Sequence, residues 1–246
     1  MSLLETHNLT KSFGRMVAVD HVDLTIADGQ LTAVIGPNGA GKTTLFDVIT
    51  GRLRPTAGRI TFRGQDITGW PSHAIVSRGI ARSFQVTNVF PELTVADNFR
   101  VAVLSTRRFA GRHGVRGSAA RAPAEVARLL REMGLQSYAE LPCAVLSHAD
   151  QRLVDIGLAL AGCPHLLLLD EPTAGMGPAE TVAMTHLIRH LAQHERLTVV
   201  LTEHDMQVVF ALAERVVVMH QGRIIADGAP AVVRDDPLVR AAYLGQ

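Results

Sequence analysis

The 246-residue sequence contains only two cysteines, Cys143 and Cys163, and almost no excess of charge of either sign. Two cysteines cannot form the disulfide framework of a small secreted domain, so we expect reduced thiols in a cytosolic protein. The 24 Lys and Arg residues nearly balance the 23 Asp and Glu residues, which leaves a formal net charge of +1. This balance lacks the basic excess of many nucleic-acid-binding proteins, and we expect no nucleic-acid partner.

The sequence also lacks an apolar run long enough to cross a membrane. Its most apolar stretch, residues 156–169, is interrupted by Gly162, Pro164 and His165. It is also shorter than the roughly 20 residues that a spanning helix needs. The first residues, MSLLETHNLTKSF, carry charges where a signal peptide has its apolar segment, so we expect no signal peptide. Any membrane association is therefore expected to be peripheral.

What the sequence does contain is 47% hydrophobic residues, enough for a substantial core, arranged in alternating strand and helix patterns. An apolar strand at residues 31–35 leads through a glycine-rich turn into a helical pattern from Lys42 to about Thr50. This order is the opening of an α/β nucleotide-binding core. Short strand patterns of this first part also cover residues 3–9, 22–26 and 59–62, with turn signals at residues 28–29 and 63–64.

The middle of the chain has a different character. From about Val86 to Leu160, strand patterns give way to helical patterns, which cover residues 95–104, 124–133 and 153–160. Strand patterns return at residues 166–169, 198–201 and 216–219, with helical stretches from about Ala179 and Met206. Runs that are apolar throughout suit parallel strands buried on both faces. We predict one domain, with a core of residues 1–85 and 161–246 and a helical lobe of residues 86–160.

Between two of the expected lobe helices lies a segment rich in Gly and Arg, TRRFAGRHGVRGSAARA, at residues 106–122. One interpretation is a solvated, mobile loop. The other is a contact with acidic lipid headgroups through the arginines between Arg107 and Arg121.

The stretch GPNGAGKTT matches the pattern G-x-x-x-x-G-K-[ST] of a phosphate-binding loop. Its glycines let successive backbone N–H groups point at phosphate oxygens, and the following helix adds a favourable dipole. Lys42 is expected to reach the β- and γ-phosphates, and the Thr43 hydroxyl to face Mg²⁺. The expected nucleotide-binding residues of this stretch are Gly36, Pro37, Asn38, Gly39, Ala40, Gly41, Lys42, Thr43 and Thr44.

A second stretch, HLLLLDEPT at residues 165–173, is an apolar strand that ends in two carboxylates. On its own it reads as a buried strand with a polar exit turn. Beside a phosphate-binding loop, Asp170 fits the metal-directing aspartate at the end of a neighbouring strand. Glu171 then lies towards the γ-phosphate, where its carboxylate can act as general base for the attacking water.

Three further residues gain a role from this context. Gln85, in RSFQ, lies where the core meets the lobe and is expected to contact Mg²⁺ or the water. His204, in LTEHD, follows an expected strand at the edge where ligands of α/β sheets bind, so we expect a γ-phosphate contact. Phe13, in KSFG, is expected to stack on adenine. Without that context, each would be an ordinary surface or structural residue.

The heptapeptide LSHADQR, at residues 146–152, places a polar cluster before an apolar helical pattern. It reads as a helix start capped by Ser or Asp. It reads equally as a turn in which Ser147 and a helix N-terminus face a bound anion. The local sequence does not distinguish these interpretations.

In their order and spacing, these motifs resemble those of ABC-transporter ATPase subunits over essentially the whole chain. The resemblance implies a RecA-like α/β core with an antiparallel β subdomain, an inserted helical lobe, ATP and Mg²⁺ as ligands, and a head-to-tail dimer. It identifies LSHAD as the signature usually written LSGGQ. Ser147 and Ala149 are then expected at the nucleotide of a second, identical or paralogous ATPase. Ala149 and Asp150 depart from that signature, which bears on the strength of this contact.

Longer stretches resemble ATPases of branched-chain amino-acid importers, among them GIARSFQVTNVFPELTVADNF, DEPTAGMGPAET and GRIIADGAPAVVRDDPLVRAAYLGQ. The resemblance implies a location at the cytoplasmic membrane face and contact with permease subunits near residues 86–98. A solute-binding protein is then an indirect partner. Import of urea, amides or another solute remains an alternative.

Two other classes remain open. A soluble ABC ATPase of DNA repair or of ribosomes usually has long coiled-coil insertions or two ATPase domains, and this sequence shows neither. A purely regulatory nucleotide-binding protein would lack Glu171 or His204, and both are present.

Overall fold

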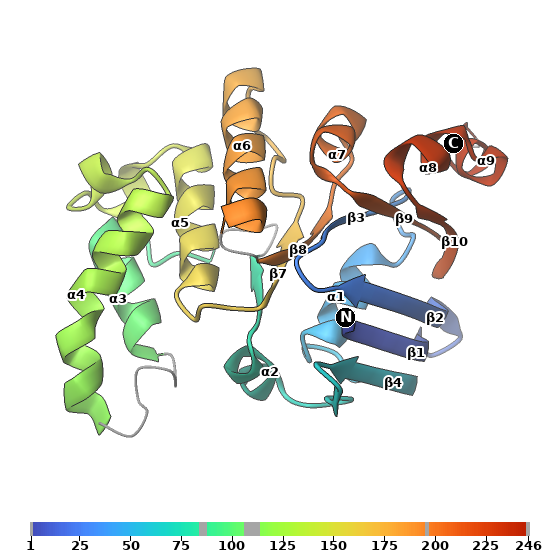
Figure 1. Cartoon of the computed structure of the whole chain (residues 1–246), viewed down its shortest axis with the longest axis horizontal. Coiled ribbons are helices and arrows are strands. Elements are labelled where there is room, and N and C mark those ends of the chain that lie inside the picture. The colour runs from blue at the N-terminus through green and yellow to red at the C-terminus, as the bar shows by residue number, and fades with distance from the viewer. Residues whose placement is uncertain (1, 84–87, 106–113, 195–196, 245–246) are drawn as a thin grey trace.

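The computed structural model describes residues 2–83, 88–105, 114–194 and 197–244. Within these ranges the strands form two sheets, some helices flank the sheets, and others form a lobe at one end of the molecule (Figure 1). The described chain contains no helix with the length and apolar character that a membrane crossing requires.

The larger sheet has the strand order β10-β9-β3-β8-β7-β6. Its strands β6 to β9 and β3 run parallel, and β10 closes one edge antiparallel to β9. All residues of β3, β7 and β8 are buried, as expected for parallel strands covered on both faces. The strands are β3 (Leu31–Ile35), β6 (Ile80–Ser83), β7 (Leu166–Asp170), β8 (Thr198–Thr202), β9 (Arg215–His220) and β10 (Arg223–Gly228).

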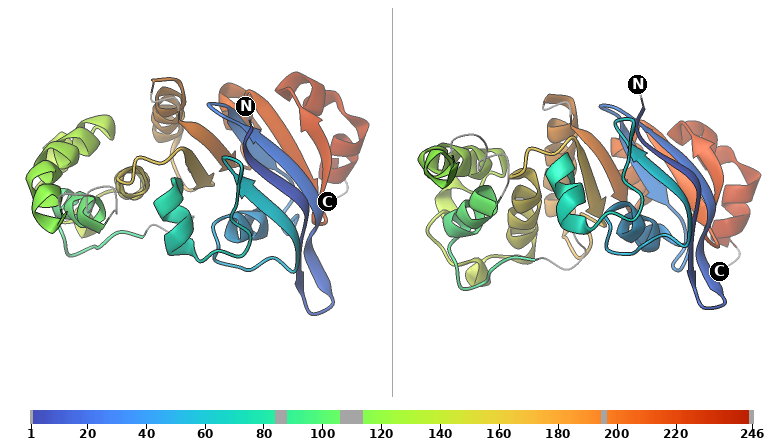
Figure 2. Two further views of the ribbon diagram at one scale, coloured as in Figure 1. Left: turned by 60° about the horizontal axis from the view of Figure 1, so that its bottom comes forward. Right: turned by 90° about the horizontal axis from the view of Figure 1, so that it is seen from below.

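The smaller sheet is antiparallel, with the order β2-β1-β4-β5. Its strands are β1 (Ser2–Phe13), β2 (Met16–Ala27), β4 (Ala57–Phe62) and β5 (Gln65–Asp66). Helix α1 (Lys42–Ile49) packs between the two sheets, because Leu45, Phe46 and Ile49 share one apolar cluster with residues of both. Figure 2 shows this layering from two further directions. The α/β core and the antiparallel subdomain expected from the resemblance are confirmed.

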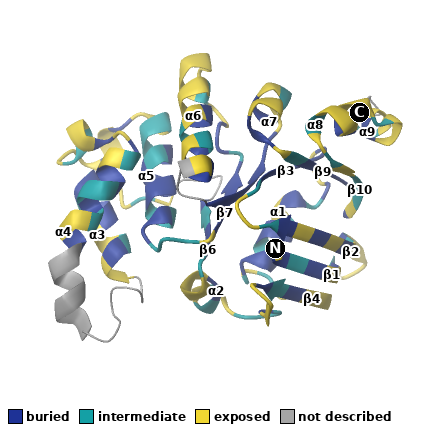
Figure 3. Cartoon of the chain, in the orientation of Figure 1, coloured by how far each residue is buried: buried dark blue, intermediate teal, exposed yellow. Residues whose placement is uncertain are grey.

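The opposite face of the larger sheet is covered by helices. Alternate residues of β7 divide between the faces: Leu166 and Leu168 pack towards α1, and Leu167 and Leu169 pack towards the other apolar cluster. Figure 3 shows the resulting buried inner surfaces and the exposed outer helix surfaces. Besides α1, the helices are α2 (Ser72–Arg78), α3 (Val95–Ser105), α4 (Gly114–Glu132), α5 (His148–Leu160), α6 (Pro178–His194), α7 (Met206–Leu212), α8 (Pro230–Asp235) and α9 (Pro237–Leu244), with short 3₁₀ turns at Gln136–Tyr138 and Cys143–Val145.

The helical lobe consists of α3, α4 and α5, which lie together at the left of Figure 1. The prediction of a loop over residues 106–122 is wrong from Gly114 onwards, because α4 begins there and contains Pro123. Glycines and this proline favoured a loop, whereas the surrounding alanines and arginines are strong helix formers, and their preference prevails. Arg107, Arg108 and Arg112 lie outside the described residues, so the lipid-contact interpretation remains a hypothesis.

Both cysteines are free thiols, as expected. Cys143 is buried in the lobe, and burial raises the pKa of its thiol. Cys163 is partly exposed and lies before β7, where its sulfur is 3.9 Å from Nη2 of Arg128.

Candidate active site

The glycine-rich loop lies between the end of β3 and the start of α1. Gly36 and Gly41 have φ angles of +151° and +102°, which side chains rarely permit. A Cβ on Gly36 would lie 2.1 Å from the carbonyl oxygen of Met219, and one on Gly41 would lie 2.2 Å from that of Ala18. Glycine is therefore required where the loop packs against β9 and β2.

Lys42 is the first residue of α1, and its ammonium lies inside this loop. Its Nζ donates hydrogen bonds to the carbonyl oxygens of Gly36 (2.6 Å) and Pro37 (3.0 Å), and the residue is only 6% exposed. Burial lowers the pKa of Lys42, and the negative charges of Glu171 and Asp170 oppose that shift. A buried cation at a helix N-terminus forms an anion-binding position.

A cleft of about 460 Å³ opens over the loop. It brings together most of the predicted nucleotide-binding residues and the carboxylate residue Glu171. Met16, Val17, Ala18 and Gln221 also line it, and sequence reasoning did not find them. The complete lining is Met16, Val17, Ala18, Asn38, Gly39, Ala40, Gly41, Lys42, Thr43, Thr44, Glu171 and Gln221.

Phe13 does not belong to that lining. It ends β1 and is 43% exposed, and the Nζ of Lys11 lies 5.0 Å from the centre of its ring. Lys11 also donates to the carbonyl oxygen of Arg54. Met16 and Val17, after the hairpin turn, line the cleft on this side. Stacking of Phe13 on adenine stays a prediction.

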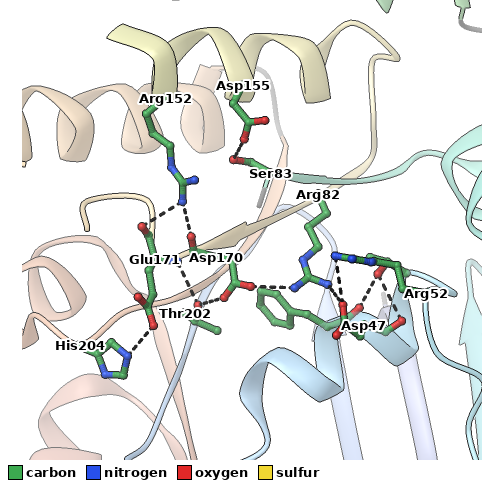
Figure 4. A network of polar contacts seen from close by, with 12 residues as sticks. Asp47, Arg52, Arg82, Ser83, Arg152, Asp155, Asp170, Glu171, Thr202 and His204 are labelled. Carbon is green, nitrogen blue, oxygen red and sulfur yellow. Dashed lines mark hydrogen bonds and ion pairs between the residues drawn. The ribbon is translucent and has the colours of Figure 1, made fainter. Parts of the chain in front are cut away.

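Asp170 ends β7 with both carboxylate oxygens hydrogen-bonded. Oδ1 accepts from the Thr202 hydroxyl (2.7 Å), which lies opposite it on β8, and Oδ2 accepts from Nη2 of Arg82 (2.8 Å) on β6. Arg82 also donates to Asp47 on α1 (2.7 Å), so it joins three elements beneath the site (Figure 4). Sequence reasoning missed Arg82, although it stands three residues before Gln85 in RSFQ.

Glu171 follows directly, in a left-handed backbone conformation with φ +46°. Its carboxylate oxygen Oε1 lies 2.6 Å from Nε2 of His204 (Figure 4). The buried carboxylate of Glu203 fixes the adjacent turns, because it accepts hydrogen bonds from the N–H and hydroxyl of Thr173 and from the N–H of His204. The structure thus pairs the two predicted catalytic side chains.

The oxygen donors Thr43 and Asp170 suit a magnesium ion, which prefers a few protein oxygens together with phosphates and water. An ionised carboxylate has about four acceptor positions, so Asp170 keeps acceptor capacity beyond Thr202 and Arg82. Among the described residues, no three His, Cys, Asp or Glu side chains form a metal-holding cluster by themselves. Gln85, the third predicted metal contact, lies outside the described residues.

The predicted signature residues lie apart from this cleft, at the start of α5. Ser147 is the N-cap: its Oγ accepts from the N–H of Asp150 (3.1 Å) and donates to the Asp150 carboxylate (2.7 Å). The side-chain amide of Gln151 donates hydrogen bonds to the carbonyl oxygens of Cys143 and Leu146, which holds the helix start against the preceding turn. Neither Ser147 nor Ala149 lines the cleft of the same chain. The helix-cap interpretation of LSHADQR is confirmed, and the anion contact stays a prediction.

A glycine-rich loop, two carboxylates after a neighbouring buried strand, and an inserted helical lobe are the parts of an ATP-binding cassette. The family model described as ABC transporter matches residues 19–174, more than half of the chain. The chain therefore belongs to the ABC transporter family. A second model, described as branched-chain amino acid ATP-binding cassette transporter, matches residues 223–246.

Individual relatives agree with this assignment. The chain is 39% identical to the high-affinity branched-chain amino acid transport ATP-binding protein BraF of Pseudomonas aeruginosa, covering 99% of this chain and 98% of that one. It is 38% identical to LivG of Escherichia coli, of the same description, with the same coverage. It is 34% identical to the lipopolysaccharide export system ATP-binding protein LptB of Escherichia coli, over 100% and 98%.

Solved structures show the same fold. A nucleotide-free ATP-binding cassette from an ABC transporter superposes with a TM-score of 0.87 at 30% identity and full coverage of both chains. The ADP conformation of an ATP-binding cassette gives 0.85, also at 30% identity and full coverage.

Proposed function

We propose that this chain is the ATP-hydrolysing subunit of an ABC importer, most directly one for branched-chain amino acids. The observation that carries the proposal is the pairing of Glu171 with His204, with Glu171 at the edge of the cleft over the glycine-rich loop. A regulatory protein that only binds nucleotide has no need of a carboxylate and an imidazole at that edge. A soluble non-transport ABC ATPase would hold the same pair, so transport is preferred on the similarity to BraF and LivG, which are described as transport proteins.

The chemistry follows from the positions of the side chains. Backbone N–H groups of the loop and Lys42 bind the phosphates, and Lys42 exchanges its loop carbonyl partners for phosphate oxygens. Glu171 orients the attacking water and accepts its proton, while His204 steadies the carboxylate and reaches the γ-phosphate. Thr43 and Asp170, with Gln85, would hold Mg²⁺, which supplies charge neutralisation at the phosphates.

The second part of the proposal is a head-to-tail dimer with an identical or paralogous ATPase. Ser147 and His148 are exposed at the N-terminus of α5 and Ala149 is half-buried, in a position separate from their own cleft. A helix N-terminus is suited to an anion, and the γ-phosphate of the other subunit is the anion proposed here.

The branched-chain amino acid assignment rests on two similarities. The full-length relatives BraF and LivG carry that description, and residues 223–246 match the corresponding C-terminal model. The lipopolysaccharide export protein LptB is less similar, at 34% identity, and we place export second. Import of urea or amides remains the alternative within import.

Permease subunits are the proposed membrane partners, and the location is the cytoplasmic face of the membrane. Their proposed contact lies near residues 86–98. Phe90, in this stretch, is 51% exposed, and the buried Asn98 fixes its backbone by accepting from the Phe90 N–H (2.8 Å) and donating to its carbonyl oxygen (3.0 Å). An exposed aromatic side chain on a hydrogen-bonded backbone is suited to a protein contact.

The test is transport. The chain should be purified with its co-expressed permeases, reconstituted in liposomes, and assayed for ATP-driven uptake of labelled leucine against urea. We expect leucine uptake that Glu171→Gln abolishes. Urea uptake without leucine uptake would support the alternative, and tight binding of the isolated chain to protein-free liposomes would instead support a lipid contact.

A further inference from the structure

Two buried side chains tie helix α5 to the catalytic core. Arg152 and Asp155, one helical turn apart, are 2% and 5% exposed. The Asp155 carboxylate accepts hydrogen bonds from the hydroxyl of Ser83 (2.5 Å) and from the N–H of Asn88 (3.1 Å). Arg152 reaches in a different direction, towards the end of β7 (Figure 4).

The Nη2 of Arg152 donates to the carbonyl oxygens of Asp170 and of Glu171, the latter at 3.1 Å. On its other side, the N–H of Glu171 donates to the carbonyl oxygen (3.1 Å) and the hydroxyl (3.2 Å) of Thr202 on β8. The backbone of Glu171 is therefore held by α5 at its carbonyl group and by β8 at its N–H group.

This support matters because Glu171 has φ +46°, a conformation that residues with a Cβ seldom adopt. Such a conformation persists only where surrounding groups hold it. The backbone sets the direction of the Cα–Cβ bond of Glu171, from which the carboxylate makes its 2.6 Å contact with His204.

Arginine suits this buried position. Burial lowers the pKa of the Arg152 guanidinium, and the negative charges of Asp155, Asp170, Glu203 and Glu171 oppose that shift. The planar guanidinium fixes the position of Nη2, the one nitrogen that donates to both carbonyl oxygens, whereas an ammonium on a flexible stem is not fixed in this way.

We propose that Arg152 is a positioning residue for ATP hydrolysis: it holds Glu171 in its productive geometry and makes turnover depend on the position of helix α5. This inference rests on the proposed function, in which Glu171 is the general base. The same helix begins at Ser147, which is proposed to meet the nucleotide of the second subunit. When the nucleotide of the second subunit binds at the start of α5, Arg152 therefore transmits this contact to the carboxylate of Glu171, which acts on the nucleotide of its own chain.

The test compares Arg152→Lys with Asp155→Asn in the full chain. Arg152→Lys keeps the charge and loses the planar group that places Nη2 between the two carbonyl oxygens, so kcat should fall about 10- to 100-fold, the effect of a small misplacement of a reacting group. KM for ATP and ATP affinity by calorimetry should remain as in the parent. Asp155→Asn keeps the size of the side chain and an acceptor for the Asn88 N–H, so α5 should stay in place. It removes only the charge beside Ser83 and leaves the contacts of Arg152 with β7, so it should lower Tm and leave kcat close to the parental value.

ATP-dependent dimerisation separates positioning from a general displacement of α5. In a Glu171→Gln background, Arg152→Lys should dimerise like its parent, because the cap at Ser147 is intact. Where Arg152→Lys does not fold, Arg152→Gln keeps a neutral N–H donor and serves the same comparison.

Three results would overturn the inference: parental kcat in Arg152→Lys, an equal loss of kcat in Asp155→Asn, or weakened dimerisation that parallels the loss of kcat. A double variant with Glu171→Gln should lose no more activity than Glu171→Gln alone, because both changes act on one step. If Glu171→Gln itself hydrolyses ATP normally, the general-base role that the proposed function gives to Glu171 fails, and that outcome is distinct from failure of the Arg152 inference.

Discussion

The nucleotide cleft and the start of α5 differ in how their polar groups are partnered. Around the cleft, Asp170 and Glu171 contact side chains of other elements, Lys42 donates to carbonyl groups of the glycine-rich loop, and Lys42 and Asp170 are buried. At the start of α5, the hydroxyl of Ser147 is hydrogen-bonded only to Asp150 among the described residues, and Ser147 is exposed.

The difference indicates that a single chain completes the nucleotide cleft but not the site at the start of α5. Side chains held by buried partners are preorganised before a ligand arrives, and they act on the nucleotide bound to the same chain. The exposed start of α5 has the geometry to bind an anion. The phosphate-binding groups of the same chain lie elsewhere, at the cleft. We therefore expect changes at the cleft to have larger effects than changes at α5.

The largest effect is expected from Glu171→Gln. The amide keeps the contact with His204 and removes the base, so turnover should fall by about two to four orders of magnitude with ATP binding intact. Steady-state hydrolysis and ATP titration measure the two quantities, and the ATP-bound dimer should accumulate. Near-normal hydrolysis would contradict the assignment of the general base.

Next in size is the loss of the ammonium of Lys42. Lys42→Met keeps most of the stem, so ATP affinity should fall by about 1.5–3 kcal/mol, the contribution of a hydrogen bond to a charged group. Hydrolysis should collapse with it. Calorimetry gives the affinity, and circular dichroism establishes that the loop residues still fold without this ammonium. An unchanged affinity would exclude Lys42 from phosphate binding.

A smaller and more selective effect is expected from Ser147→Ala. ATP affinity of the monomer should stay constant, whereas the ATP-bound dimer should weaken by about 1–3 kcal/mol per site. Light scattering in the Glu171→Gln background measures it.

Because Ser147 also caps α5, its removal should cost about 0.5–2 kcal/mol of stability. Ser147→Asn restores a capping side chain without the hydroxyl and is the matched control: weak dimerisation with normal Tm separates ligand contact from capping. Ala149→Arg should impair dimerisation more strongly, through its bulk. If both Ser147→Ala and Ser147→Asn dimerise like the parent, Ser147 has no ligand contact and serves only as a helix cap.

The smallest effect is expected from Ala149→Gly. Removal of the Cβ should let the backbone approach the phosphate and tighten the dimer or raise hydrolysis. The gain is limited because glycine in a helix costs about 1 kcal/mol relative to alanine. Dimerisation with ATP affinity measured in parallel is again the assay. No change would indicate that a paralogous partner supplies the efficient site.

The sequence predicted the central strands β3, β7 and β8 of the larger sheet well because they are apolar for most of their length. β3 agrees with the predicted residues 31–35, and β7 and β8 each extend one residue beyond theirs. It missed β6 and β10, which are short or half-exposed and lack a distinctive period. It also placed the start of α4 ten residues late, because glycines and Pro123 masked a run of helix formers.

The glycine-rich loop could be identified from local sequence alone, because its spacing and its glycines are a local requirement of phosphate binding. The sequence also determined Asp170, Glu171 and His204 as candidates, since each follows a strand that ends at the same sheet edge. Only the tertiary structure brought Arg82 to Asp170 and Arg152 to the carbonyl group of Glu171, across 88 and 19 residues of sequence. Contacts between side chains of separate elements leave no periodic pattern in a sequence, because they depend on how the elements pack.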